Sequence, residues 1–166
     1  ILNSDLWKRS GHWDNFKENM YFTEIDEQEF AVKPMNCPGC SLIYKNHLHS
    51  YKELPIRYAE LGTVHRHELS GVLHGLFRVR ALTQDDAHIF CTPDQVQEEF
   101  LNVLELTKLV LAKAGFEKFT AQISLRDLSK PEKYLGDPAT FARAEQDIID
   151  AVAKAGLEAV QVPGEA

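Results

Sequence analysis

Two cysteines separated by two residues are the sharpest chemical feature of this sequence. They end the segment Cys37–Cys40, which reads CPGC, and this spacing suits half of a zinc site, a redox dithiol or two unrelated core cysteines. His88 and Cys91 add two more residues of the zinc-ligand type, but a strand through His88 sends Cys91 to its opposite face. Cys37, Cys40 and His88 therefore form one candidate set of three ligands.

Polar side chains also recur at every second position of the segment 84–90, most of which lies in the apolar strand candidate 85–91. Alternation places Gln84, Asp86, His88 and Phe90 on one face. Polar groups at successive inward positions cost several kcal/mol unless they are paired, bound to a ligand or hydrated. The pattern therefore predicts a binding site.

A long hairpin over residues 57–84 carries a second polar face. On its returning strand Arg78, Arg80, Leu82 and Gln84 share one side, and Arg66 and Glu68 can lie across from the arginines. Guanidinium groups on a rigid sheet suit a polyphosphate or carboxylate, because their planar fork donates paired hydrogen bonds. The alternative is a set of cross-strand ion pairs on a solvated face.

The helices and strands predicted from the sequence, which must position these residues, indicate an α+β fold. One helix begins after the capping pair Thr92 and Gln95 and ends at Gly115, another runs from Asp137 to Gly156, and a shorter one spans 38–49. The strand candidates are 19–24, 28–33, 57–66, 76–83, 85–91 and 118–125. Their short connections favour an antiparallel sheet with helices on one face, in a single domain spanning residues 1–166.

Composition agrees with one soluble globular domain. The chain has 166 residues, of which 44% are apolar and 26% charged, which excludes disorder and a collagen-like structure. A net charge of −7 gives no overall attraction to nucleic acid or to an anionic membrane. The sequence contains neither a long apolar span nor a secretory signal, which favours the cytoplasm, and both ends suggest a piece of a longer protein.

Several blocks of the sequence resemble the threonyl-tRNA synthetase family of class II aminoacyl-tRNA synthetases. The blocks are Leu6–Trp13 (LWKRSGHW), Lys33–Gly39 (KPMNCPG), Arg66–Gly71 (RHELSG), Leu73–Leu76 (LHGL), Arg78–Arg80 (RVR) and Thr83–Phe90 (TQDDAHIF). The resemblance extends over nearly the whole chain, and blocks of this length are specific. It implies the class II catalytic core, an antiparallel sheet flanked by helices, with residues 57–84 as its motif 2 hairpin.

The resemblance also implies an activity and residue roles. The family activates threonine with ATP, which is bound with Mg²⁺, to threonyl-adenylate with release of pyrophosphate, and transfers the threonyl group to tRNA(Thr) as a homodimer. By similarity Arg66 holds the α-phosphate of ATP and the threonine carboxylate, Glu68 contacts the adenine side and Arg78 assists with phosphate. Gln84 is expected to meet the threonine carboxylate, and Asp86 the threonine hydroxyl.

The family also binds one Zn²⁺, and by similarity Cys37 and His88 are two of its three protein ligands. The third ligand and motif 3 are expected beyond Ala166, and motif 1 before Ile1. Two positions depart from the family: Cys40 replaces a usual histidine and is a possible substitute ligand, and Leu82 replaces an aromatic residue that stacks on adenine. We therefore expect this chain alone to be weak or inactive in adenylation.

Two other functions remain open. One is a non-catalytic, synthetase-like module that binds threonine or nucleotide. The other is a redox or structural zinc protein built on Cys37 and Cys40, which leaves the polar hairpin face unexplained.

Overall fold

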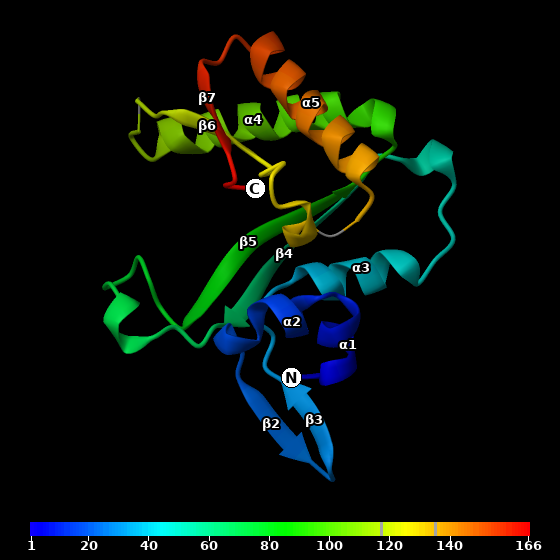
Figure 1. The fold of residues 1–166 in the computed structure, drawn as a ribbon, viewed down its shortest axis with the longest axis vertical. Helices are drawn as coiled ribbons and strands as arrows, with labels where there is room; N and C mark the ends of the chain where they lie inside the picture. Colours follow the sequence, from blue (N-terminus) through cyan, green and yellow to red (C-terminus); the bar gives the residue numbers. More distant parts are fainter. Residues whose placement is uncertain (117, 135) are drawn as a thin grey trace. The chain divides into compact units, whose positions relative to one another are not determined.

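In the computed structural model, which describes residues 1–116, 118–134 and 136–166, the chain divides after Phe90. The first unit is Ile1–Phe90 and the second is Cys91–Ala166 (Figure 1). Helices and antiparallel sheets occur together, so the α+β expectation is confirmed. None of the helices that the structure describes is long and apolar enough to cross a membrane.

The first unit begins with a small sheet and two short helices. Its elements are β1 (Leu2–Asn3), α1 (Ser4–Arg9), α2 (His12–Phe16), β2 (Phe22–Ile25) and β3 (Gln28–Ala31), with a 3-10 turn at Lys17–Asn19. Strand β3 lies between β1 and β2 and is antiparallel to both. The two helices, which the sequence patterns did not predict, help to bury Trp7, Met20 and Ala31 as the core of this part.

The second part of this unit carries the residues of chemical interest. Its elements are α3 (Cys37–Lys45), β4 (Ile56–His65) and β5 (Ala81–Phe90), with 3-10 turns at Tyr51–Glu53 and Ser70–Val72. Strands β4 and β5 form a two-stranded antiparallel ribbon (Figure 1). Along β5 the even-numbered side chains from Leu82 to His88 are half-buried and the odd-numbered ones are exposed, which confirms the predicted alternation.

The predicted hairpin differs from the observed one at its tip. The sequence predicts separate strands at 76–83 and 85–91, whereas one strand, β5, runs without interruption from Ala81 to Phe90. Before it, residues 66–80 form a loop in which only His74 and Arg78 make an isolated bridge, across a turn that includes Gly75 at φ +51°. Arg78 and Arg80 therefore belong to this loop and not to a strand face, because the turn interrupts the ladder before β5 begins.

The second unit is a helical layer on a small sheet. Its elements are α4 (Val96–Lys113), β6 (Ala121–Leu125), α5 (Pro138–Lys154) and β7 (Ala159–Pro163), with 3-10 turns at Pro93–Gln95 and Pro131–Lys133. The capping box of Thr92 and Gln95 is present as predicted, and the helix expected from Asp137 begins at Pro138, with the Asp137 side chain accepting from the Thr140 backbone. Strand β6 pairs in parallel with β7, a pairing that the sequence analysis did not predict. Helix α5, which lies between the two strands in the chain, provides the crossover that parallel neighbours require.

Candidate functional site

Asn36 connects two of the polar side chains that the sequence singles out on β5. Its amide Nδ2 donates to a carboxylate oxygen of Asp86 at 3.0 Å and to Oε1 of Gln84 at 3.4 Å. Only 1% of Asn36 is exposed, and its Oδ1 makes no hydrogen bond to any described residue. The interaction holds Gln84 and Asp86 side by side, and sequence periodicity carries no signal for Asn36.

Gly62 makes room for this arrangement from the neighbouring strand. It is the register partner of Gln84, and a Cβ at this position would overlap three atoms of the Asn36 side chain. A larger residue would therefore displace Asn36 or bend the ribbon. The backbone of β4, the amide of Asn36 and the polar groups of β5 thus form one packed layer.

A second polar cluster lies in the loop between β4 and β5. The carboxylate of Glu68, which is only 6% exposed, accepts a 2.9 Å bond from Nη2 of Arg78, while Nε of Arg80 donates to the Glu68 carbonyl at 3.0 Å. The Arg80 carbonyl in turn accepts from the Arg66 backbone N–H at 2.8 Å. The structure therefore brings Arg66, Glu68, Arg78 and Arg80 together, but in a loop and not on the strand face that the sequence predicts.

The positions of the arginines leave them able to meet an anion. Nε of Arg66 donates to the Pro34 carbonyl at 3.2 Å, and its guanidinium lies 5.8 Å from the ring centre of Phe16, which fixes the side chain from two sides. Arg78 leaves 58% of its side chain exposed beside the buried Glu68 carboxylate. The ion pairing that the sequence analysis gave as the alternative is present between Arg78 and Glu68. Because the Glu68 carboxylate is buried and the Arg78 side chain is exposed, this pair differs from an ion pair on a fully solvated face.

The cysteines of the CPGC segment occupy the first turn of α3. Cys37 is exposed, whereas Cys40 is 5% exposed. Burial raises the pKa of the Cys40 thiol, and the carboxylates of Glu60 and Asp86 and the Cys37 thiol raise it further. This shift favours the neutral thiol of Cys40, in contrast to the thiolate that binds a metal.

His88 has one ring nitrogen without a protein partner. Its Nδ1 is buried and makes no hydrogen bond to the described residues, and His88 faces Tyr58 across the ribbon. Within residues 1–116, 118–134 and 136–166, no group of three or more His, Cys, Asp or Glu side chains is arranged to hold a metal ion. The chain therefore offers Cys37 and His88 as donors but does not complete a site from its described residues.

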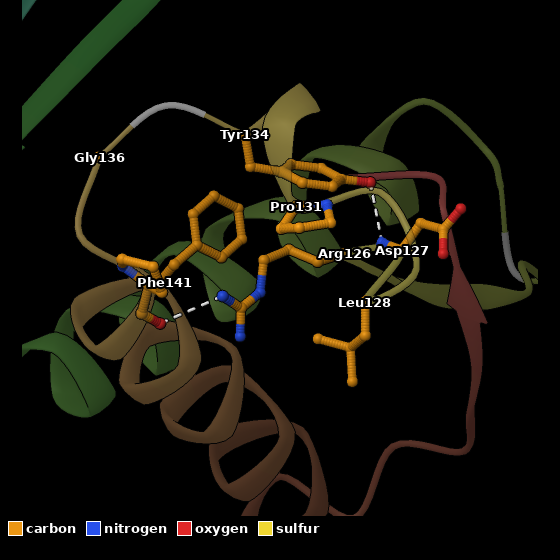
Figure 2. Close-up of a pocket in the computed structure, with 8 residues that line it drawn as sticks. Arg126, Asp127, Leu128, Pro131, Tyr134, Gly136 and Phe141 are labelled. Atoms are coloured by element: carbon orange, nitrogen blue, oxygen red, sulfur yellow. Dashed lines mark hydrogen bonds between the residues drawn. The ribbon is translucent and has the colours of Figure 1, made fainter.

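The second unit contains a separate apolar hollow of 280 Å³ beside Arg126. Figure 2 shows the Arg126 guanidinium close to Phe141, and its Nη1 donates to the Pro138 carbonyl at 3.1 Å. Glu145 accepts from both the Arg126 backbone N–H and Nε, at 2.7 and 3.1 Å. These contacts join the residue after β6 to α5. Because Glu145 neutralises Arg126, the pair offers no net positive charge to a ligand.

Comparison with known proteins assigns the chain to a family. The family model described as tRNA synthetase class II core domain (G, H, P, S and T) matches residues 21–162. The threonine–tRNA ligases of Clostridium tetani and Acetivibrio thermocellus are each 56% identical over 158 residues, or 95% of this chain. The chain spans only about a quarter of the length of these curated relatives, 24% in both cases.

A solved structure shows the same fold at high similarity. The crystal structure of the RNA binding domain of threonyl-tRNA synthetase from Cryptosporidium parvum Iowa II aligns with a TM-score of 0.88 and 41% identity. The alignment covers 99% of this chain and 40% of that chain. Since the family model matches most of the sequence, the chain belongs to the class II tRNA synthetase core-domain family (G, H, P, S and T), and within that family it is similar to threonine–tRNA ligases.

Proposed function

We propose that this chain forms the part of a threonine–tRNA ligase catalytic core that contacts ATP and threonine. The observation that carries the proposal is the pair of polar clusters in the first unit, Asn36 with Gln84 and Asp86, and Glu68 with Arg78. Both clusters are held by backbone or buried partners, as a binding site requires. Residues 57–84 are then the motif 2 segment of one catalytic domain.

The arginine cluster is proposed to bind ATP. Arg66 would hold the α-phosphate and the threonine carboxylate that attacks it, so that its charge offsets the negative charge that develops on the phosphoryl oxygens. Glu68 would contact the adenine side, and the exposed guanidinium of Arg78 would contact phosphate. Catalysis would rest on positioning and electrostatics, which is usual for phosphoryl chemistry, with Mg²⁺ accompanying the nucleotide.

The β5 face is proposed to bind threonine. Gln84 would contact the carboxylate and Asp86 the hydroxyl, and the Asn36 amide would keep both side chains in position. The chemistry of Cys37 and His88 fits two of the ligands of a zinc ion, with a further ligand supplied outside the described residues. Cys37 and His88 would hold this ion, which would supply a Lewis acid that recognises the hydroxyl group by which threonine differs from valine, a distinction that an apolar pocket makes poorly.

The parent enzyme is proposed to transfer the threonyl group to tRNA(Thr), in the cytoplasm and as a homodimer. The names of the threonine–tRNA ligases that the chain resembles support the transfer reaction. Leu82 would contact adenine with an aliphatic surface, which replaces aromatic stacking by apolar contact.

Calorimetric titration with ATP and Mg²⁺ tests the nucleotide part of the proposal. We expect Arg66→Ala to weaken ATP binding by about tenfold or more, because a hydrogen bond from a charged donor contributes roughly 1.5–3 kcal/mol. The matched control is Arg143→Ala, which removes an exposed guanidinium of α5 paired with Asp94 and should leave ATP affinity unchanged. Equal affinities of wild type and Arg66→Ala, or no ATP binding at all, would contradict the proposal.

Two further measurements separate the remaining alternatives. In elemental analysis of wild type, Cys37→Ser, Cys40→Ser and His88→Ala, zinc that is lost with Cys37 and His88 would support these two ligands, and dependence on Cys40 would identify it as a replacement ligand. No zinc in wild type would show that the expected third ligand is indispensable. Threonine-dependent ATP/pyrophosphate exchange by the 166-residue chain should be weak or absent. Robust exchange would overturn that expectation, and ATP binding by a complete parent protein without exchange would identify a non-catalytic binding module.

A further inference from the structure

The two thiols of the CPGC segment lie on one turn of α3. The Cys40 backbone N–H donates to the Asn36 carbonyl at 3.1 Å, which shows that this turn is helical. Residues three apart on a helix are neighbours, with Cβ atoms about 5–6 Å apart. A disulfide needs a Cα separation of about 4.4–6.8 Å, which a helical turn meets, and Cβ atoms about 3.5–4.5 Å apart, so the first turn of α3 must tighten by about 1 Å to close the bond.

The two cysteines differ in exposure, and this difference suits the two successive steps of thiol–disulfide exchange. Cys37 is exposed, so a reagent from solvent can reach its sulfur. Cys40 is 5% exposed and neighbours Cys37 on the inner side of the same turn. Cys37 is therefore suited to react first and Cys40 second, within the chain. The raised pKa of the Cys40 thiol slows this second step, which proceeds because the mixed disulfide on Cys37 is held beside it.

A basic hollow beside Cys37 indicates which reagent is favoured. The hollow has a volume of 390 Å³ and is lined by Cys37 together with Arg9 of α1, His12 of α2 and Lys45 of α3. Among the residues that the structure describes, no acidic side chain lines it. Positive charge around a reactive group raises the local concentration of anions, which speeds their encounter with it.

We propose that Cys37 and Cys40 are a thiol modification site that a small anionic disulfide, such as oxidised glutathione, converts to an intramolecular disulfide. The Cys37 sulfur attacks one glutathione sulfur, the glutathione S–S bond breaks, and one glutathione thiol leaves. The Cys40 sulfur then attacks Cys37, breaks the mixed disulfide and releases the second glutathione thiol. Two cysteine thiols are oxidised, one disulfide is reduced to two thiols, and the protons lost by the cysteines end on the released thiols.

This inference does not depend on nucleotide or threonine binding. The antiparallel ribbon beside α3 is not the β-α-β setting of a thiol oxidoreductase, so the site is one of modification and not of redox catalysis. Where Cys37 serves as a metal ligand, the disulfide would remove it from that role, because only the thiolate binds metal.

Intact mass and peptide mapping test the proposal on the reduced, metal-free chain treated with oxidised glutathione. Wild type should lose two hydrogen atoms in mass without retaining glutathione, and the bond should map to Cys37 and Cys40. Cys40→Ser should retain one glutathione on Cys37, and Cys37→Ser should form neither product. Cys91→Ser is the matched control and should behave like wild type, because Cys91 lies outside this turn.

Three results would overturn the inference: a stable glutathione adduct in wild type, a product that involves Cys91, or no reaction. The wild-type map decides the matter even where a cysteine variant fails to fold. The basic hollow has its own test, the ratio of the rates with oxidised glutathione and with the cationic disulfide cystamine. In an Arg9→Glu, Lys45→Glu variant this ratio should fall by about tenfold, at the lower end of electrostatic steering effects, and an unchanged ratio would exclude a role for the hollow.

Discussion

Replacing Gly62 by alanine tests the packed layer that holds the β5 polar groups. The added methyl group would overlap Oδ1, Cγ and Nδ2 of Asn36, which is almost completely buried and cannot move into solvent. Adding a methyl group to a tightly packed site costs about 1–3 kcal/mol. We therefore expect Gly62→Ala to lower the free energy of unfolding of the first unit by about 2 kcal/mol.

The double variant with Asn36→Ala makes the test specific. Asn36→Ala alone removes the donor to Gln84 and Asp86, and a lost hydrogen bond to a charged group costs about 1.5–3 kcal/mol. In the double variant the smaller side chain at position 36 leaves space for the new methyl group. The double variant should then lose less stability than the sum of the two single losses, and the difference, which is the coupling energy, should be about 1–2 kcal/mol.

Urea unfolding followed by tryptophan fluorescence measures these differences. Both tryptophans, Trp7 and Trp13, lie in the first unit, and Trp7 is completely buried, so its emission reports on that unit. A loss of about 2 kcal/mol corresponds to a midpoint lower by roughly 1 M urea, for a slope near 2 kcal/mol/M. Ser70→Ala, in the exposed 3-10 turn of the loop, serves as the control and should leave the midpoint unchanged. Additive single effects, or a wild-type midpoint in Gly62→Ala, would refute the reasoning.

Two predictions concern the second unit. Glu145→Ala should destabilise it by about 1.5–3 kcal/mol, measured by circular dichroism in urea, because the Arg126 side chain is only 13% exposed and would keep the Pro138 carbonyl as acceptor but lose its carboxylate partner. Glu105→Ala, from an exposed pair of α4, should cost less than about 1 kcal/mol, and equal effects of the two variants would contradict this explanation. Hydrogen bonds from the Thr140 side chain and backbone lower the pKa of Asp137, so its stabilising effect should be complete above about pH 4 and be lost as the pH falls through its lowered folded-state pKa. In Asp137→Asn this loss at acid pH should disappear, and an unchanged acid-unfolding profile would show that the cap does not control it.

Local sequence signals determined much of the secondary structure. The capping pair of Thr92 and Gln95 and the pair Asp137 and Pro138 predicted the starts of the two long helices, because the signals for a helix start lie within a few residues of it. The alternation from Leu82 to His88 predicted the half-buried face of β5 in the same way. The sequence blocks shared with threonyl-tRNA synthetases indicate the family by themselves, and the match to the class II core-domain model confirms it.

Long-range contacts decided what local signals did not. The parallel partner of β6 lies beyond α5, and the short helices before β2 are stabilised by the core around Trp7, so neither follows from a local period. Residues 76–80 have the alternation of a strand, but the turn between His74 and Arg78 interrupts pairing there.

At the candidate site, residue types and their spacing identify the side chains that could do chemistry, whereas long-range packing fixes how these side chains are held. Residue type and alternation identified Gln84, Asp86 and His88, because both can be read along the chain. The Asn36 amide that joins Gln84 to Asp86, and the space that Gly62 leaves for it, depend on segments far apart in sequence. A hydrogen bond of this kind depends on how the chain packs against itself, so only the folded structure could reveal it.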